Sequence, residues 1–320
     1  MSDFALNERA WALADRTIAR ATDMRIEVHA LPSGARVLDA GINVVGGLTA
    51  GLTLARLCMG GLGHVRFVPL TIGGESWPGV QVWTDHPAEC CMASQYAGWA
   101  INPDGFFAMG SGPLRAKARV EKELFLKLGY AEDASRGVLV LEGRALPTDD
   151  VAAWVARKAG VEPGALTFAV APTASLAGGV QIVARVIETG LHKMHAIGFD
   201  VTRVLSAMGT APLPPIARSD IRAIGRTNDC ILYGGQARYT VRADDEELAR
   251  LAERLPASAS ADYGTPFHDI FKRYDNDFYK IDPMLFSAAE VWLTSAASGR
   301  TFHAGRLNPD VLRASLFGEV

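Results

Sequence analysis

The sequence predicts an α/β fold, in the form of a two-domain mixed α/β subunit. An apolar run at 138–142, a helical pattern at 149–159 and a second apolar run at 166–171 make a strand–helix–strand unit. Alternating apolar runs near both ends of the chain, joined by Gly-containing turns, predict hairpins. The chain has 320 residues, of which 49% are hydrophobic and 21% are charged. This size and composition suit one large or two ordinary domains.

Charge and hydropathy exclude several classes of protein. The formal net charge is −3 and the sequence pI is about 6.2, so no basic field indicates nucleic acid or an anionic membrane as a partner. No apolar run approaches the roughly 20 residues of a transmembrane helix. The first ten residues are polar and lack the basic start and apolar centre of a signal peptide. We therefore expect a cytoplasmic protein.

The cysteines and histidines do not form a metal-binding motif. No C-x-x-C is present, and we expect core packing for the cysteines in apolar surroundings. His192 and His195 are three residues apart, but no H-E-x-x-H accompanies them. The sequence therefore predicts no metal. The four cysteines are Cys58, Cys90, Cys91 and Cys230.

The N-terminal part begins with an amphipathic helix over 4–22 and continues into a hairpin. Its two runs, 24–31 and 35–40, are joined by Pro32-Ser33-Gly34. A short helix follows over 48–57 and ends at a glycine-rich segment.

That segment contains Gly60, Gly61 and Gly63 and precedes a strand at 65–70. A phosphate cradle needs the opposite order, a strand, then the glycines, then a helix. We therefore expect these glycines to form tight turns.

The next stretch is predicted as a strand at 80–85 and an apolar helix at 88–101. This helix contains Ser94 and Gln95, polar side chains that need partners from the backbone or from a ligand. A charged helix over 114–128 then follows Gly110-Ser111-Gly112-Pro113. Its start is either an ordinary capped helix or an anion site, because its first N–H groups are free of intrahelical partners.

A helix expected over 172–193 carries the most informative pattern. Its wide apolar stripe leaves one narrow polar line, with residues four, three and four apart, so that they share a face. The line consists of Gln181, Arg185, Glu188 and His192. Two interpretations stay open: an exposed i,i+3 ion pair, or a carboxylate facing a cleft, with its basicity set by Arg185 and partial desolvation.

The remaining elements suggest how the domains divide. We expect a hairpin formed by 230–233 and 237–242, a helix over 244–255, a linker at 256–262, and a hairpin formed by 290–295 and 300–305. The last hairpin has a Ser-Gly turn like that of the first, which suggests one shared domain. We expect residues 1–130 plus 251–320 to form a first α/β domain, and 131–250 a second that carries the Arg185/Glu188 helix.

Taken together, these segments resemble the methenyltetrahydromethanopterin cyclohydrolase family over nearly the whole chain. The resemblance is carried by six blocks in order: Cys58-Met-Gly-Gly-Leu-Gly63, Ala93-Ser-Gln-Tyr-Ala-Gly-Trp-Ala-Ile101, Ala108-Met-Gly-Ser-Gly-Pro113, Ala184-Arg-Val-Ile-Glu-Thr189, His195-Ala-Ile-Gly-Phe-Asp200, and Gly225-Arg-Thr-Asn-Asp229 with Tyr233-Gly-Gly235.

The resemblance implies a cytosolic hydrolase of tetrahydromethanopterin-linked one-carbon metabolism. Such an enzyme interconverts 5,10-methenyl-tetrahydromethanopterin and N5-formyl-tetrahydromethanopterin, with the pterin in a cleft between two domains. The resemblance implies a homo-oligomer, usually a trimer, and no metal or permanently bound cofactor. The tetrahydromethanopterin derivative is the substrate. The family's catalytic Arg and Glu match Arg185 and Glu188.

Five further residues are candidates for binding the pterin, because its fused rings present several donor and acceptor edges. They are Ser94, Gln95, Gln181, Asn228 and Asp229. For each of them, satisfaction of buried backbone groups is the structural alternative.

Two rival functions remain. A non-catalytic pterin-binding or oligomeric scaffold protein would keep the cleft without needing Glu188. A phosphate-binding enzyme would use Gly110-Ser111-Gly112 at the start of a helix. An Ala- and Arg-rich composition with only slight net acidity fits an ordinary bacterium better than a salt-adapted archaeon. For a bacterium, the resemblance implies that the reaction serves the formaldehyde oxidation of a methylotroph.

Overall fold

The structure, a computed structural model, describes residues 4–318. Spatial proximity along the chain separates two compact units. The first comprises the described residues up to His64 together with Glu89–Gln181. The second comprises Val65–Ala88 and the described residues from Ile182 onward. Each unit is α/β and has its own six-stranded mixed sheet, as the sequence predicted for the fold class.

The sheet of the first unit has the strand order β1-β2-β8-β7-β6-β5. Its central strands β2, β8 and β7 are parallel, and the outer neighbours on each side are antiparallel. The strands are β1 (Glu27–Ala30), β2 (Arg36–Asp39), β5 (Trp99–Ile101), β6 (Ala108–Ser111), β7 (Gly137–Gly143) and β8 (Leu166–Ala171).

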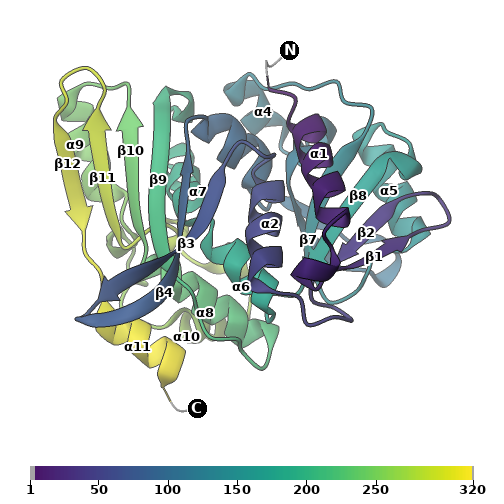
Figure 1. The fold of residues 1–320 in the computed structure, drawn as a ribbon. Coiled ribbons are helices and arrows are strands. Elements are labelled where there is room, and N and C mark those ends of the chain that lie inside the picture. Colours follow the sequence, from purple (N-terminus) through teal and green to yellow (C-terminus); the bar gives the residue numbers. More distant parts are fainter. Residues whose placement is uncertain (1–3, 319–320) are drawn as a thin grey trace. The chain divides into compact units, whose positions relative to one another are not determined.

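Helices cover both faces of this sheet, because alternate residues of its strands point to opposite sides. Val138 and Val140 of β7 pack with α1 (Leu6–Ile18) and α2 (Leu48–Cys58); Figure 1 shows both helices against β7. Leu139 and Leu141 pack on the other face with α3 (Pro113–Ala118) and α5 (Asp149–Ala159). The unit is therefore a three-layer sandwich whose central strands are apolar on both faces.

The sheet of the second unit has the strand order β12-β11-β10-β9-β4-β3 (Figure 1). β10 and β11 are parallel, whereas the pairs β11–β12, β9–β10 and β4–β9 are antiparallel. The strands are β3 (His64–Ile72), β4 (Glu75–Thr84), β9 (Val204–Pro212), β10 (Gln236–Val241), β11 (Glu290–Ser295) and β12 (Thr301–Gly305).

Five helices accompany this second sheet. They are α7 (Val186–Ala196), α8 (Asp220–Leu232), α9 (Asp245–Arg254), α10 (Phe267–Arg273) and α11 (Pro309–Phe317). α7 packs on β9 and β10, α9 packs on β11 and β12, and α8 contacts both α10 and α11. Within residues 4–318, no helix combines the length and the apolar character needed to cross a membrane.

The two units divide the chain differently from the expected domains. β2 pairs in parallel with β8, so the N-terminal hairpin shares a sheet with residues 137–171. β11 pairs in parallel with β10, so the C-terminal hairpin shares a sheet with β9 and β10. These long-range pairings group residues that lie in different expected domains.

Most of the expected elements are confirmed. The first hairpin forms between β1 and β2, the last between β11 and β12, and the strand–helix–strand unit is β7, α5 and β8. Gly60 and Gly61 have φ angles of +60° and +69°. Because this left-handed region favours glycine, the turning role expected for them is confirmed.

Two expected helices are each divided in the structure. The helix expected over 114–128 is α3 followed by α4 (Lys122–Leu128), because Arg119 adopts a left-handed conformation that ends α3. The helix expected over 88–101 is a π-helix, Ala88–Gln95, followed by β5. The N–H of Tyr96 bonds to the carbonyl of Cys91 at 2.8 Å, five residues back, which closes the wide final turn.

The hairpin expected between 230–233 and 237–242 is wrong. Cys230 and Ile231 belong to the last turn of α8, whose first turn is capped by the Ser219 side chain. β10 instead lies between β9 and β11. β9 was not expected from the sequence.

Candidate active site

Arg185 and Glu188 lie where the helix expected over 172–193 is broken. α6 (Leu176–Val183) ends there, and the N–H of Arg185 bonds to the Ile182 carbonyl at 2.9 Å, only three residues back. Arg185 then caps α7, and its carbonyl accepts from the N–H of Thr189 at 2.9 Å. The prediction of a single helix over 172–193 is therefore wrong, because a tight turn at Ala184 and Arg185 separates α6 from α7.

The turn places Glu188 in the first turn of α7. Helix N-termini carry partial positive charge, which favours an ionised carboxylate at this position. The side chains are largely shielded from solvent, with 5% exposure for Glu188 and 8% for Arg185. This burial does not fit the exposed surface ion pair that the sequence also allowed, and it favours a carboxylate in a partly desolvated site.

The start of α7 is fixed to the sheet of the second unit. The Tyr239 hydroxyl on β10 donates to the Ile187 carbonyl at 2.9 Å. A Cβ atom added to Gly190 would lie 2.1 Å from the same hydroxyl oxygen, so glycine is needed for this close approach. Ile187 and Val186 also lie against Gly209 of β9. Tyr239 is fully buried and was not predicted, because nothing near it in sequence indicates α7.

The far half of α7 is held by a buried lysine. Lys193 Nζ donates to the Pro256 carbonyl at 2.7 Å and to the Met284 carbonyl. Burial lowers the pKa of Lys193 to about 7, with Asp282 opposing the effect and Arg254 adding to it. Ala257 is fully buried and its N–H bonds to the Ala288 carbonyl, so residues 256–262 are a packed segment rather than the expected linker.

A second polar cluster lies within the first unit. Ser94, at the end of the π-helix, donates to the Cys58 carbonyl at 2.6 Å, and its own carbonyl accepts from the N–H of Gly112 at 2.8 Å. Cys58 Sγ lies 3.1 Å from Ser111 Oγ and 3.8 Å from Gln181 Oε1. The structure thus brings together Ser94 and Gln181, two of the candidate pterin-binding residues, around Cys58. From the sequence, Cys58 was expected only to pack in the core.

Gln95 follows directly at the end of the π-helix and is fully buried. π-helical turns occur frequently at functional sites, because they displace side chains from a regular helical register. The phosphate-binding alternative required free N–H groups in Gly110-Ser111-Gly112. The N–H of Gly112 is already used, because it donates to the Ser94 carbonyl. α3 itself spans only Pro113–Ala118.

Arg115 fixes this π-helix and was not singled out by the sequence. Its guanidinium group is fully buried and donates to the Tyr96 carbonyl at 2.9 Å and to the Met92 carbonyl. It also donates to the Glu121 carboxylate at 2.9 Å. Arg115 therefore joins both ends of the turn that carries Ser94. Its position among the other charges of 114–128 gave no signal of this role.

Asn228 and Asp229 lie on α8. Asn228 is half-buried, and its amide donates to the Ile224 carbonyl at 2.8 Å. Asp229 is fully buried and accepts from the N–H of Phe267 at 2.8 Å and from the Ser315 hydroxyl. Burial raises the pKa of Asp229 to about 7, although these two bonds oppose the rise. These contacts give Asp229 a structural task, the fastening of α10 and α11 to α8.

A group of potential metal ligands within the described residues is Glu27, His29 and Asp39, whose ligand atoms lie within 4.8 Å of one another. The Asp39 carboxylate already accepts three bonds from the backbone N–H groups of residues 41–43, at 2.7–2.9 Å. Its oxygens thus order the loop after β2, and the sequence prediction of no metal stays a prediction.

Comparison with known proteins assigns the class. The family model described as Cyclohydrolase (MCH) matches residues 5–316. The chain belongs to this family of cyclohydrolases.

The relatives carry one name. A methenyltetrahydromethanopterin cyclohydrolase of Methylobacillus flagellatus is 47% identical over 312 residues, covering 97% of this chain and 95% of the relative. Proteins of the same name are 48% identical in Rhodopirellula baltica, covering 91% and 89% of the two chains, and 42% identical in Methanococcoides burtonii, covering 97% and 98%. The resemblance stated from the sequence blocks is confirmed.

Proposed function

We propose that this chain is a cyclohydrolase that hydrolyses 5,10-methenyl-tetrahydromethanopterin reversibly to N5-formyl-tetrahydromethanopterin. Support comes from the family match over residues 5–316 and from relatives that carry this name. The observation that carries the proposal is the burial of Glu188 in the first turn of α7, three residues after Arg185. This is where the sequence resemblance places the catalytic pair.

In the proposed mechanism, Glu188 acts as a general base on water. The methenyl carbon lies between two nitrogens and shares their positive charge, so it is already electrophilic. Glu188 takes a proton from the attacking water while the water oxygen bonds to the carbon. The negative charge of Glu188 also stabilises the cationic substrate. Water addition gives a neutral tetrahedral intermediate that carries one hydroxyl group.

The second half of the reaction returns the proton. The protonated Glu188 gives its proton to the departing nitrogen as the bond between that nitrogen and the carbon breaks. The hydroxyl proton leaves with the surrounding water, and the carbon becomes a formyl group on the other nitrogen. We assign Arg185 to the oxygen of the intermediate, since a guanidinium group donates several hydrogen bonds to developing negative charge.

Substrate binding is proposed for four of the sequence candidates. Ser94, Gln95 and Gln181 are buried polar residues of the first unit, and Asn228 is half-buried on α8 in the second. Amide and hydroxyl groups of this kind match the donor and acceptor edges of a pterin. For Asp229 we propose a structural role instead, because the N–H of Phe267 and the Ser315 hydroxyl already occupy its oxygens.

Further features are proposed from the family resemblance. They are the absence of a permanently bound cofactor, assembly as a homotrimer and a cytoplasmic location. The relatives from Methylobacillus flagellatus and Methylobacterium organophilum support a place in the formaldehyde oxidation of a methylotrophic bacterium.

The test follows the near-ultraviolet absorption of the methenyl bridge after the protein is added. The wild-type chain should remove this band rapidly. Glu188→Gln should slow the reaction by at least about 100-fold, since general base catalysis contributes about 10²–10⁴-fold. Substrate binding should persist, because glutamine keeps the size of the side chain.

The matched control is Glu246→Gln, which removes a carboxylate that is 90% exposed on α9. It should react like the wild-type chain. Normal turnover in Glu188→Gln would remove Glu188 as the base. Binding without loss of the band in the wild-type chain would instead support the non-catalytic pterin-binding alternative.

A further inference from the structure

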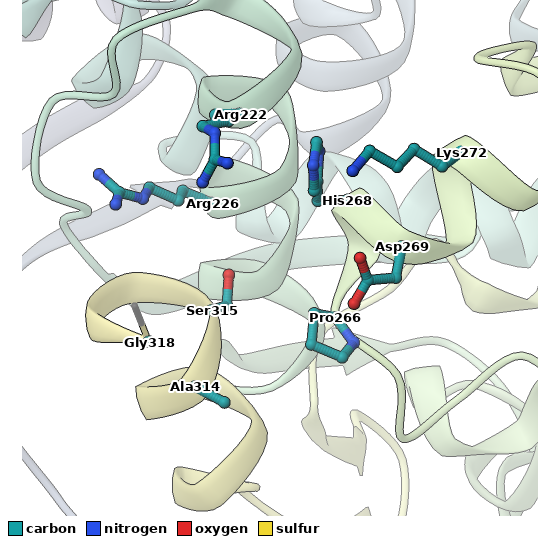
Figure 2. Close-up of a pocket in the computed structure, with 9 residues that line it drawn as sticks. All are labelled: Arg222, Arg226, Pro266, His268, Asp269, Lys272, Ala314, Ser315 and Gly318. Atoms are coloured by element: carbon teal, nitrogen blue, oxygen red, sulfur yellow. The ribbon is translucent and has the colours of Figure 1, made fainter. Parts of the chain in front are cut away.

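A second candidate binding site is a small basic pocket within the second unit (Figure 2). Its volume is about 230 Å³, which is below the roughly 300–1,000 Å³ of pockets that bind drug-sized ligands. The pocket therefore suits a small ion. Its walls come from α8, α10 and α11 and their flanking segments; the lining side chains are those of Arg222, Arg226, Pro266, His268, Asp269, Lys272, Ala314 and Ser315.

The charge of this pocket is predominantly positive. Arg222 and Arg226 extend from α8, and Lys272 extends toward the pocket from α10 (Figure 2). Asp269 is the one acidic side chain in the lining, so three positive charges face one negative charge and the net charge is +2. None of the three cations forms an ion pair with any residue between 4 and 318.

This arrangement is unfavourable without a ligand. Arg222 and Arg226 are four residues apart on α8, where like charges destabilise a helix. Burial lowers the pKa of Arg226, and the charge of Arg222 lowers it further. Burial also lowers the pKa of His268, with further lowering by Lys272 and Arg222. For the pKa of both groups, burial is the larger cause of the lowering and the neighbouring positive charges add to it, while Asp269 opposes the lowering at His268.

The donors around the pocket are only partly used. Arg226 Nη1 lies 3.3 and 3.2 Å from the carbonyl oxygens of Pro215 and Ile216. His268 Nδ1 is shielded from solvent, and no hydrogen-bond partner for it lies in the described part of the chain. Two forked guanidinium groups and an ammonium group suit a tetrahedral oxyanion, which accepts bidentate hydrogen bonds from arginine.

We propose that this pocket binds a phosphate dianion, either free or as the end group of a larger molecule. A double negative charge matches the net charge of +2, and the phosphate oxygens would accept from Arg222, Arg226 and Lys272. Binding relieves the repulsion between the two arginines. The site is separate from the proposed catalytic pair, since the pocket lining does not include Arg185 or Glu188.

The test titrates inorganic phosphate into the full chain by calorimetry, in a phosphate-free buffer at constant ionic strength. We expect saturable binding at one site. Arg222→Gln and Arg226→Gln should each weaken this binding by tenfold or more. The matched control is Arg250→Gln, which removes a 70% exposed arginine on α9 and should leave the affinity unchanged.

A measurement of thermal stability accompanies the titration. Without phosphate, Arg222→Gln should unfold at the wild-type temperature or above it, because a repulsive pair has been removed, whereas Arg226→Gln also loses its bonds to the Pro215 and Ile216 carbonyls. With saturating phosphate, the wild-type chain should gain stability and the variants should gain much less. Unfolding of Arg222→Gln at a lower temperature without phosphate would identify a structural cluster and overturn the proposal.

Further titrations show whether the ligand is the free ion or the end group of a larger molecule. Glycerol 3-phosphate that competes with inorganic phosphate would show that the pocket accepts the end group of a larger molecule, whereas binding of inorganic phosphate alone would assign the free ion. Wild-type affinity in both pocket variants, with loss of binding in Arg185→Gln, would place the phosphate elsewhere and overturn the proposal.

Discussion

The Tyr239 hydroxyl donates a 2.9 Å hydrogen bond to the carbonyl oxygen of Ile187, the residue immediately before Glu188. A side chain from the sheet of the second unit thus holds the first turn of α7 by its backbone. Because the proposed base lies on this turn, the bond connects the position of a catalytic group to a strand more than forty residues further along the chain.

Tyr239→Phe should therefore affect catalysis as well as stability. Loss of one hydrogen bond should lower the free energy of unfolding by about 1 kcal/mol. We also expect kcat to fall by about tenfold with a smaller change in KM, since small displacements of a catalytic group slow chemistry strongly. Steady-state kinetics and urea unfolding measure the two effects.

Tyr233→Phe is the matched control, because the Tyr233 hydroxyl also donates to a backbone carbonyl, that of Thr265 at 2.6 Å, and accepts from the N–H of Gly264, neither of which belongs to α7. It should lose similar stability and keep its kcat. Equal kcat values in the two variants would mean that Tyr239 is only a structural residue.

Gly190→Ala tests the close approach between α7 and β10. The added Cβ would lie 2.1 Å from Tyr239 Oη and 3.0 Å from Cζ. Overpacking of this kind should lower the free energy of unfolding by about 1–3 kcal/mol. Gly179→Ala on α6 should be neutral or stabilising by up to about 1 kcal/mol, because a Cβ there meets no atom within 4 Å.

A double variant sharpens this prediction. Tyr239→Phe removes the oxygen nearest to the new Cβ, so the loss in Gly190→Ala/Tyr239→Phe should be less than the sum of the two single losses. Strictly additive losses would show that the clash is not with Tyr239.

Arg115→Lys should loosen the π-helix that carries Ser94 and Gln95. Lysine keeps the charge but cannot reproduce bonds to the Met92 carbonyl, the Tyr96 carbonyl and Glu121 together. We expect a loss of about 2–4 kcal/mol in the free energy of unfolding and a higher KM for the pterin. The control is Arg300→Lys, because Arg300 is 68% exposed and paired with Asp245. It should change neither the free energy of unfolding nor the KM. An unchanged KM in Arg115→Lys would argue against a substrate role for the π-helix.

Asp229 should make stability depend on pH in a specific window. Its folded pKa is raised from 3.8 to about 7, so its contribution is fully present below pH 3.8 and is lost as pH rises through about 7. Asp229→Asn keeps a neutral side chain at every pH. The free energy of unfolding of the wild-type chain should therefore fall relative to that of the variant between pH 4 and pH 7, by on the order of 4 kcal/mol.

Urea unfolding at several pH values measures this difference. Asp310→Asn is the control, since Asp310 lies on the exposed side of α11, and its stability should run parallel to that of the wild-type chain. A constant difference between wild-type and Asp229→Asn would show that Asp229 is ionised throughout this range.

Local signals account for the elements that the sequence predicted correctly. α5 begins after Thr148, whose side chain accepts from the N–H of Val151, and ends at Gly160, which has a φ of +67°. Both devices act within a few residues, so both can be read from the sequence.

Long-range packing accounts for what the sequence did not reveal. The break at Ala184 and Arg185 contains neither Gly nor Pro, and α7 is oriented by Tyr239 of a distant strand. The three-residue bond between Arg185 and Ile182 changes the face that Glu188 presents. Likewise β9 exists because β4 and β10 lie on either side of it, and the role of Arg115 depends on carbonyls exposed by a π-helical turn.

Residues 65–88 belong to the second unit, although the segments before and after them in the sequence belong to the first. This arrangement has a consequence for synthesis on the ribosome. β4 emerges early, but its partner β9 begins only at Val204. Until then β4 has an unpaired edge, and such edges are prone to pair with other chains. Neither unit can be produced as one uninterrupted fragment, because each is interrupted by residues of the other. Slow translation before residue 204 should therefore increase aggregation of the nascent chain, whereas slow translation after residue 241, when β10 is also complete, should not.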